Sequence, residues 1–174
     1  MPIRVFVDSD VIISSLISQT GAAYLLMHDE RIARFVSDVS FSELKRVTGV
    51  LHLSQEDLRK LVQTRCDVVV IGDRKNELTR MAQYARDSGD AHIVLGGKLA
   101  KAKFLVTYNT KAASPDNISN SLKVDAAQGA VSQNNKRRYF GTPPMHYRSE
   151  KVREDMGIIL LPPAFLLQYL RCLN

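Results

Sequence analysis

Short apolar runs alternate with amphipathic stretches along most of this chain. The runs are rich in β-branched and aromatic residues, which is typical of strands, and they lie at residues 3–7 (IRVFV), 34–37, 68–71, 104–107 and 158–161. The stretches between and after them predict helices at residues 11–17, 22–27, 40–47, 54–63, 75–86, 90–103 and 163–173. Pro163 stands in the first turn of the last helix, where its missing N–H is tolerated.

Strands that alternate with helices predict βαβ units, a parallel sheet and right-handed crossovers. We therefore expect an α/β fold, a three-layer α/β/α sandwich around a central, mostly parallel sheet. A length of 174 residues suits a single domain over residues 1–174. In such sheets ligands bind at the carboxyl ends of the strands, so polar residues directly after strands are the first candidates for chemistry.

Residues 110–156 break the alternation. This stretch is polar, rich in Ser, Asn, Lys and Arg, and long for a connection within one domain, so we expect a flexible insertion. Part of it mixes positive charge with Tyr139 and Phe140, a combination that can bind phosphates and stack on bases. The alternative is a solvated loop. The candidate RNA-binding residues are Lys111, Lys136, Arg137 and Arg138.

Composition narrows the function classes only slightly. The formal net charge of +6 suits a polyanionic partner but equally a surplus of surface lysine and arginine. Cys66 and Cys172 stand far apart without a CxxC motif, which favours neither a disulfide framework nor a zinc site. The opening MPIRVFVD lacks a secretory core, and no apolar run could span a bilayer. We expect a cytoplasmic protein without a membrane partner.

Two aspartates follow the first predicted strand. Asp8 either caps the next helix or faces the crevice at the carboxyl edge, where a cation would offset the cost of burying its charge. Asp10 caps that helix, orients Asp8 or binds the metal itself. Because carboxylate oxygens suit hard cations, Asp8 is the stronger candidate for a metal ligand.

Further polar residues fall at the same predicted edge. Glu43 either completes an S-x-x-E capping box with Ser40 or reaches the same cation as Asp8. Asp90 opens a predicted helix, with Asp87 as the rival capping residue. Asn109 ends the strand region at 104–107. Oxygen ligands gathered in this way suit Mg²⁺ or Mn²⁺.

Four segments, in this order, resemble the PIN-domain nucleases, particularly the VapC-type toxins of toxin–antitoxin pairs. They are VFVDSDVIISSLIS, FVSDVSFSELKRV, GDAHIVLGGKLAKAKFLVTYNTK and GIILLPPAFLLQYL. Together they cover most of residues 1–109 and 157–172. The resemblance implies a metal-dependent endoribonuclease that hydrolyses RNA phosphodiester bonds. It also implies a cytoplasmic toxin with a cognate antitoxin protein and a second copy of the chain, a homodimer, as partners.

Residue by residue, the resemblance implies that Asp8, Glu43 and Asp90 bind Mg²⁺ or Mn²⁺. It makes Asn109 the fourth catalytic position, which is aspartate in some family members. Members with asparagine there often have an acid shortly after, whereas this chain continues Thr-Lys-Ala-Ala. Asp116 or Asp125 could fold back to supply the missing acid.

Two other functions compete with the nuclease. A haloacid-dehalogenase-type phosphatase would use Asp8 and Asp10 as its D-x-D pair, but its threonine should precede Asp90 rather than follow as Thr107 does. That reading also leaves Glu43 without a role. A non-catalytic PIN-like module that binds RNA or protein is the second alternative, because the fourth acid is missing. No G-x-G-x-x-G or P-loop motif supports a nucleotide-binding domain.

Overall fold

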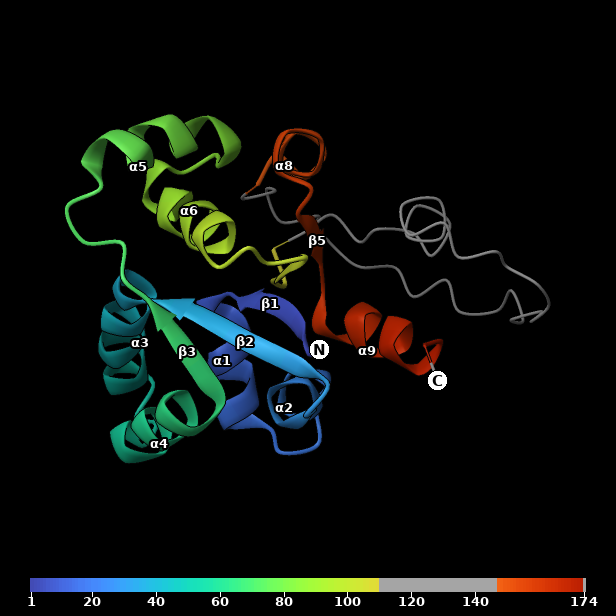
Figure 1. Ribbon diagram of the computed structural model, residues 1–174. Coiled ribbons are helices and arrows are strands. Elements are labelled where there is room, and N and C mark those ends of the chain that lie inside the picture. Colours follow the sequence, from blue (N-terminus) through green and yellow to red (C-terminus); the bar gives the residue numbers. More distant parts are fainter. Residues whose placement is uncertain (110–146, 174) are drawn as a thin grey trace, which may run out of the picture.

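The computed structural model describes residues 1–109 and 147–173, which contain one sheet of five parallel strands in the order β3-β2-β1-β4-β5 (Figure 1). The strands are β1 (Ile3–Val7), β2 (Ile32–Ser37), β3 (Cys66–Val69), β4 (Phe104–Val106) and β5 (Ile159–Leu161). The helices are α1 (Ser9–Ile17), α2 (Ala22–His28), α3 (Asp38–Val50), α4 (Gln55–Arg65), α5 (Lys75–Met81), α6 (Ala91–Leu99), α8 (Ser149–Met156) and α9 (Pro163–Arg171). Two short 3₁₀ turns, η1 (Ala82–Tyr84) and η2 (Ser88–Asp90), precede α6.

Helices cover both faces of the sheet, so the expected three-layer α/β/α sandwich is confirmed (Figure 1). Helices α1 to α4 and α9 pack on one face, and α5, α6 and α8 pack on the other. Strand β1 serves both cores because successive side chains point to opposite faces. Val5 and Val7 enter the first core and Phe6 enters the second.

The order of the strands locates the crevice of the sheet. From β1 the chain builds outward to β2 and β3, and then returns to add β4 and β5 on the other side of β1. The connections therefore change direction between β1 and β4, which is the topological switch point where open α/β sheets bind ligands. Asp8 follows β1, and Asn109 lies three residues beyond β4, at this same point.

Most predicted elements are present, but several boundaries were wrong. Strand β3 begins two residues earlier than the apolar run at 68–71 because Cys66 already pairs with Arg34 of β2. The helix expected over 75–86 ends at Met81 and tightens into η1. The helix expected over 90–103 stops at Leu99, and Lys101 adopts a left-handed backbone conformation with φ of 50° before β4 begins.

The expected insertion at 110–156 was wrong at its C-terminal end. Tyr147 pairs with Ala85 in an isolated antiparallel bridge, and α8 follows with Val152 fully buried. Tyr147 and Val152 belong to the second core. The helix was not predicted because its few apolar residues stand in a mostly polar stretch. The rest of the expected insertion lies outside the described residues.

No single helix among residues 1–109 and 147–173 has the length and apolar character needed to cross a membrane. Helices α1 and α2 meet the requirement only as a pair, and they are bent by 102° at the break between them. Both contribute buried residues to the first core.

The closest approach between α6 and the sheet yields a prediction about stability. A Cβ atom at Gly96 would overlap the ring of Phe6, which is fully buried and has no room to move. We expect Gly96→Ala to lower the free energy of unfolding by about 1–3 kcal/mol, the usual cost of overpacking a core. Urea denaturation of the purified variant measures this.

Gly97→Ala is the matched control, because a Cβ there would meet its nearest atom at an ordinary 3.5 Å. Alanine should be neutral at this helical position or stabilising by up to about 1 kcal/mol. Equal stabilities of the two variants would contradict the close packing of α6 against Phe6.

Candidate active site

Asp8 lies directly after β1 and continues its hydrogen bonding, since its N–H donates to the Val106 carbonyl at 2.9 Å. Its side chain is 4% exposed. The Ser9 N–H donates to Oδ1 at 2.6 Å, and the Tyr147 hydroxyl donates to Oδ2 at 3.0 Å. Asp8 is also the N-cap residue of α1, so the two roles considered for it from the sequence coexist.

Burial raises the pKa of Asp8 above its ordinary value, and the negative charge of Asp90 acts in the same direction. The two carboxylates are therefore close enough to repel one another. A buried carboxylate next to a second carboxylate is costly unless a proton or a cation compensates the charge.

Asp10 connects α1 to the end of β4. Its Oδ2 accepts hydrogen bonds from the Thr107 hydroxyl at 3.2 Å, the Tyr108 N–H at 2.9 Å and the Asn109 side-chain amide at 3.3 Å. Its Oδ1 is buried and has no hydrogen-bond partner among the residues that the structure describes. The helix-capping role considered for Asp10 was wrong, because α1 begins at Ser9 with Asp8 as its cap.

Burial raises the pKa of Asp10 to about 7, and the charge of Asp8 contributes further. Asp8 and Asp10 thus form a coupled pair of carboxyl groups at the switch point. Near neutral pH Asp10 therefore keeps part of the proton that an isolated aspartate would have lost.

Asp90 approaches the same place from the other face of the sheet. It precedes α6, and its side chain makes no capping hydrogen bond to that helix. Asp87, the alternative capping residue considered from the sequence, caps the 3₁₀ turn η2, because its side chain accepts from the Gly89 N–H at 2.9 Å. Burial, then the charges of Asp8 and Asp90, raise the pKa of Tyr147, so its hydroxyl stays protonated where it donates to Asp8.

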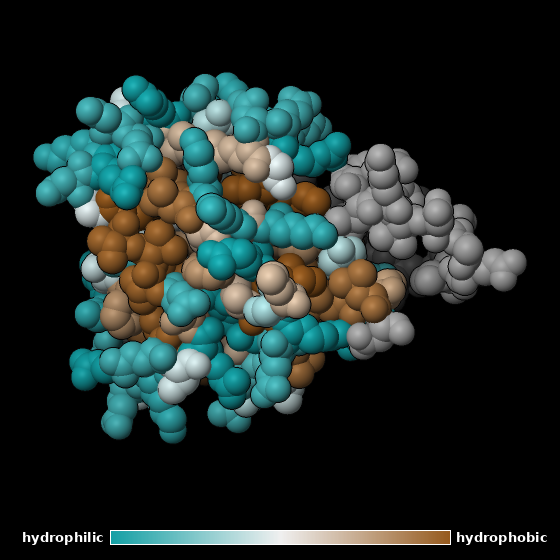
Figure 2. Space-filling model, in the orientation of Figure 1, coloured by the Kyte–Doolittle hydropathy of each residue, from teal (hydrophilic) through white to brown (hydrophobic). Residues whose placement is uncertain are grey.

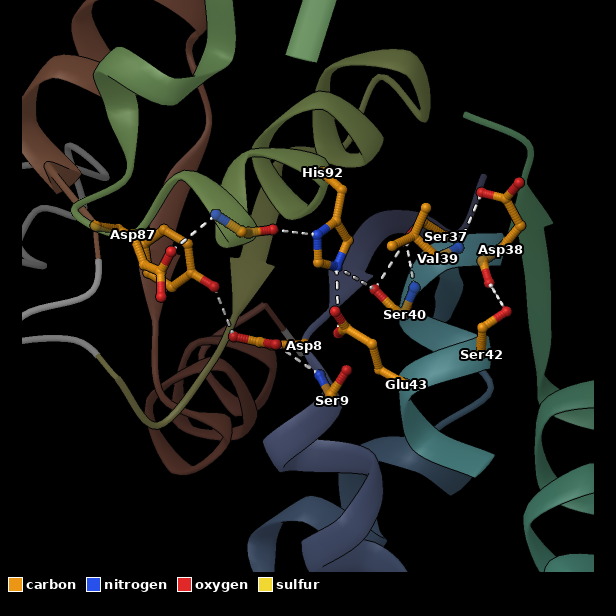
Figure 3. A network of polar contacts seen from close by, with 12 residues as sticks. Asp8, Ser9, Ser37, Asp38, Val39, Ser40, Ser42, Glu43, Asp87 and His92 are labelled. Carbon is orange, nitrogen blue, oxygen red and sulfur yellow. Dashed lines mark hydrogen bonds and ion pairs between the residues drawn. The ribbon is translucent and has the colours of Figure 1, made fainter. Parts of the chain in front are cut away.

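Glu43 does not form the capping box considered for it. Helix α3 begins at Asp38, and its cap is Ser37, whose hydroxyl accepts from the Ser40 N–H at 2.9 Å. Ser40 therefore lies inside the helix, one turn before Glu43. The Glu43 side chain is 48% exposed, and its Oε2 lies 3.6 Å from Nε2 of His92 (Figure 3).

His92 links Glu43 to the turn before Asp90. The imidazole is buried, with Nδ1 at 2.6 Å from the Gly89 carbonyl oxygen and Nε2 at 3.2 Å from the Ser40 hydroxyl (Figure 3). It thus joins α3, which follows β2, to the start of α6. This histidine connects Glu43 to the turn that contains Asp90. Within the described residues, Glu43 forms no hydrogen bond or ion pair with Asp8.

The structure therefore brings some of the predicted site residues together and leaves others apart. The charge of Asp90 acts on Asp8, the charge of Asp8 acts on Asp10, and Asn109 donates to Asp10. Within residues 1–109 and 147–173, no group of three or more His, Cys, Asp or Glu side chains is arranged to hold a metal ion. The remaining candidates lie outside the described residues: Lys111, Asp116, Asp125, Lys136, Arg137 and Arg138.

Sequence reasoning missed three residues of this site, namely Thr107, His92 and Tyr147. Thr107 was assigned to the end of a strand, although its position just after β4 is the signal that also singled out Asn109. His92 had a local signal, since it is a polar residue within the apolar run AHIVL. Tyr147 had none, because it lies 139 residues from Asp8 in a polar stretch.

No known protein-family model and no curated protein matches this chain. The resemblance to PIN-domain nucleases therefore remains a prediction from short motifs.

The pKa of Asp10 predicts how stability depends on pH without divalent metal. The folded-state pKa of about 7 lies above the ordinary 3.8, so the folded protein binds the extra proton between these values. Stability from this group is fully present below pH 4, falls as pH rises toward 7, and is then constant. At about 1.4 kcal/mol per pH unit, the upper bound of this loss is about 4 kcal/mol.

Asp10→Asn removes the charge and keeps a carbonyl acceptor. In buffer with a chelator, the stability of the variant relative to wild type should therefore increase from pH 4.5 to pH 8, as measured by urea denaturation. A constant difference across this range would show that Asp10 does not titrate as described.

Proposed function

We propose that this chain is a metal-dependent ribonuclease that hydrolyses RNA phosphodiester bonds. Asp8, Glu43 and Asp90 would bind Mg²⁺ or Mn²⁺, and Asn109 would complete the catalytic set. The observation that carries the proposal is the buried carboxylate of Asp8 at the switch point between β1 and β4, on which the charge of Asp90 acts from a different element. Perturbed carboxyl groups at such a crevice are typical of functional sites.

The chemistry of the site suits a hard divalent cation. Carboxylate oxygens are the ligands that Mg²⁺ and Mn²⁺ favour, and Asp8 and Asp90 supply them close together. The buried Oδ1 of Asp10 offers a further oxygen without a hydrogen-bond partner in the described residues. A cation here would relieve the repulsion that, with burial, raises the pKa of Asp8.

Each residue would have a distinct task in hydrolysis. A bound divalent cation would activate water and offset charge on the leaving oxygen. Asp8 and Asp90 would hold it at the crevice, and Glu43 would approach from α3 with its orientation restrained by His92. Asp10 would keep Thr107 and Asn109 in place at the end of β4.

The partners follow from the same proposal. RNA is the substrate, and the positive net charge favours its phosphates.

A homodimer and a cognate antitoxin, as in a toxin–antitoxin pair, need an apolar contact surface. Edge strand β3 and the residue after it expose Val68 and Val70, at 45% and 69%. Figure 2 shows hydrophobic surface where β3 leads toward α5, which supports binding of a protein partner there.

The central substitution is Asp8→Asn. It should lower the rate of Mg²⁺-dependent cleavage of a mixed-sequence RNA by about 100-fold or more, because even residues that only support metal ligands cost 10–100-fold. It should leave the free energy of unfolding unchanged or higher in metal-free buffer, because burial penalises the native carboxylate. Fluorescent RNA cleavage and urea denaturation give the two values.

Asp67→Asn is the matched control, because Asp67 is exposed on edge strand β3, two strands away from β1. It should cleave like wild type. Full activity of Asp8→Asn would refute the proposal, and so would RNA binding by the wild type without cleavage at any Mg²⁺ or Mn²⁺ concentration. Turnover of a phosphomonoester in place of RNA would favour the phosphatase alternative with Asp8 and Asp10.

A further inference from the structure

We propose that Tyr147 is a positioning residue for Asp8, whose hydroxyl fixes the Asp8 carboxylate in the orientation that receives the divalent cation. The inference rests on the proposed role of Asp8 as a metal ligand. Its structural basis is the 3.0 Å hydrogen bond between two buried side chains from opposite ends of the chain.

Tyr147 is held rigidly enough to orient another group. Its side chain is 2% exposed, and its backbone forms the isolated bridge with Ala85. The next residue, Arg148, donates its N–H to the Tyr84 carbonyl at 2.9 Å. The first turn of α8 then continues from Arg148 to Val152, which is fully buried. The backbone of Tyr147 is thus tied to the chain that follows η1, and its buried ring is held in the second core.

The hydrogen bonds to Asp8 leave room for a metal ion. A carboxylate has about four lone-pair directions. The Ser9 N–H occupies one on Oδ1, and the Tyr147 hydroxyl occupies one on Oδ2. The Thr107 side chain is a third hydrogen-bonding neighbour of this carboxylate, so at least one of the four directions stays free for a cation. Because both oxygens are restrained, rotation of the carboxylate is also restrained, and less ordering is required when a cation binds.

Supporting hydrogen bonds of this kind orient metal ligands, and their loss typically costs 10–100-fold in metal affinity or activity. The Ser9 donor is the neighbouring backbone and cannot be removed by substitution. The Thr107 hydroxyl also donates to Asp10, so its removal would disturb both carboxyl groups. Tyr147 therefore offers the more specific test of whether the orientation of Asp8 matters. The resemblance to PIN-domain nucleases implies no role for this residue.

The experiment compares Mn²⁺ binding by wild type, Tyr147→Phe and Tyr84→Phe without RNA, by electron paramagnetic resonance of free Mn²⁺. Tyr147→Phe keeps the buried ring and removes only the hydroxyl, so circular dichroism should be unchanged. We expect its Kd for Mn²⁺ to rise about 10-fold or more. Tyr84→Phe is the matched control, because its ring lies in the same core while its hydroxyl donates to Asp155 at 2.8 Å. Its Kd should equal that of wild type.

Val152→Ala separates positioning from general loss of packing. It should lower the free energy of unfolding by about 1 kcal/mol or more through the cavity it leaves, without changing the Kd for Mn²⁺. A Kd raised as far by Val152→Ala as by Tyr147→Phe would overturn the inference. In cleavage assays, Tyr147→Phe should raise the Mn²⁺ concentration for half-maximal rate more than it lowers the rate at saturating Mn²⁺.

Asp8→Asn distinguishes this inference from the function on which it rests. If Asp8→Asn abolishes Mn²⁺ binding and Tyr147→Phe binds like wild type, Asp8 is a ligand and Tyr147 does not position it. If wild type binds no Mn²⁺ at millimolar concentration, both the proposed function and this inference are wrong.

Discussion

Burial of the Asp8 carboxylate at the end of the central strand is the constraint around which the carboxyl edge is organised. The strand leads this charge into the core, where water cannot solvate it. The chain responds with a backbone donor from Ser9 and the hydroxyl of Tyr147, but it also brings Asp90 and Asp10 close. Negative charge is thus concentrated at a buried position. A proton can neutralise part of this charge, and in the proposed function a divalent cation does so.

The elements surrounding these acids come from distant parts of the sequence. Strand β4 ends in Thr107 and Asn109, which bind Asp10 of α1. Helix α3 presents Glu43 to His92 of α6, and the chain before α8 presents Tyr147. The parallel sheet makes this possible because it aligns the carboxyl ends of β1 and β4 at one edge. The fold therefore supplies the position of the site, and long-range side-chain contacts supply its detail.

Local patterns were sufficient to predict the class of fold and the parallel sheet. Apolar runs such as residues 3–7 carry the strands, and polar residues that follow them fall at the carboxyl edge by topology alone. Predicted element boundaries were wrong where tertiary contacts override local propensity. Strand β3, for example, begins at Cys66, which pairs with β2 before the apolar run begins. The capping box at Ser40 failed because Ser37 offered an earlier cap with the same chemistry. Tyr147 could not be predicted, since only folding brings it to Asp8.

The proposed function requires a divalent-cation site at the carboxyl edge between β1 and β4. A crystal structure grown with Mn²⁺ and measured at the manganese absorption edge would locate the ion. We expect an anomalous peak within coordination distance of Asp8 and Asp90, about 2.0–2.6 Å from their oxygens, with Glu43 turned toward it. A map in which Mn²⁺ occupies other surface positions while the oxygens of Asp8 and Asp90 contact only protein and water would contradict it.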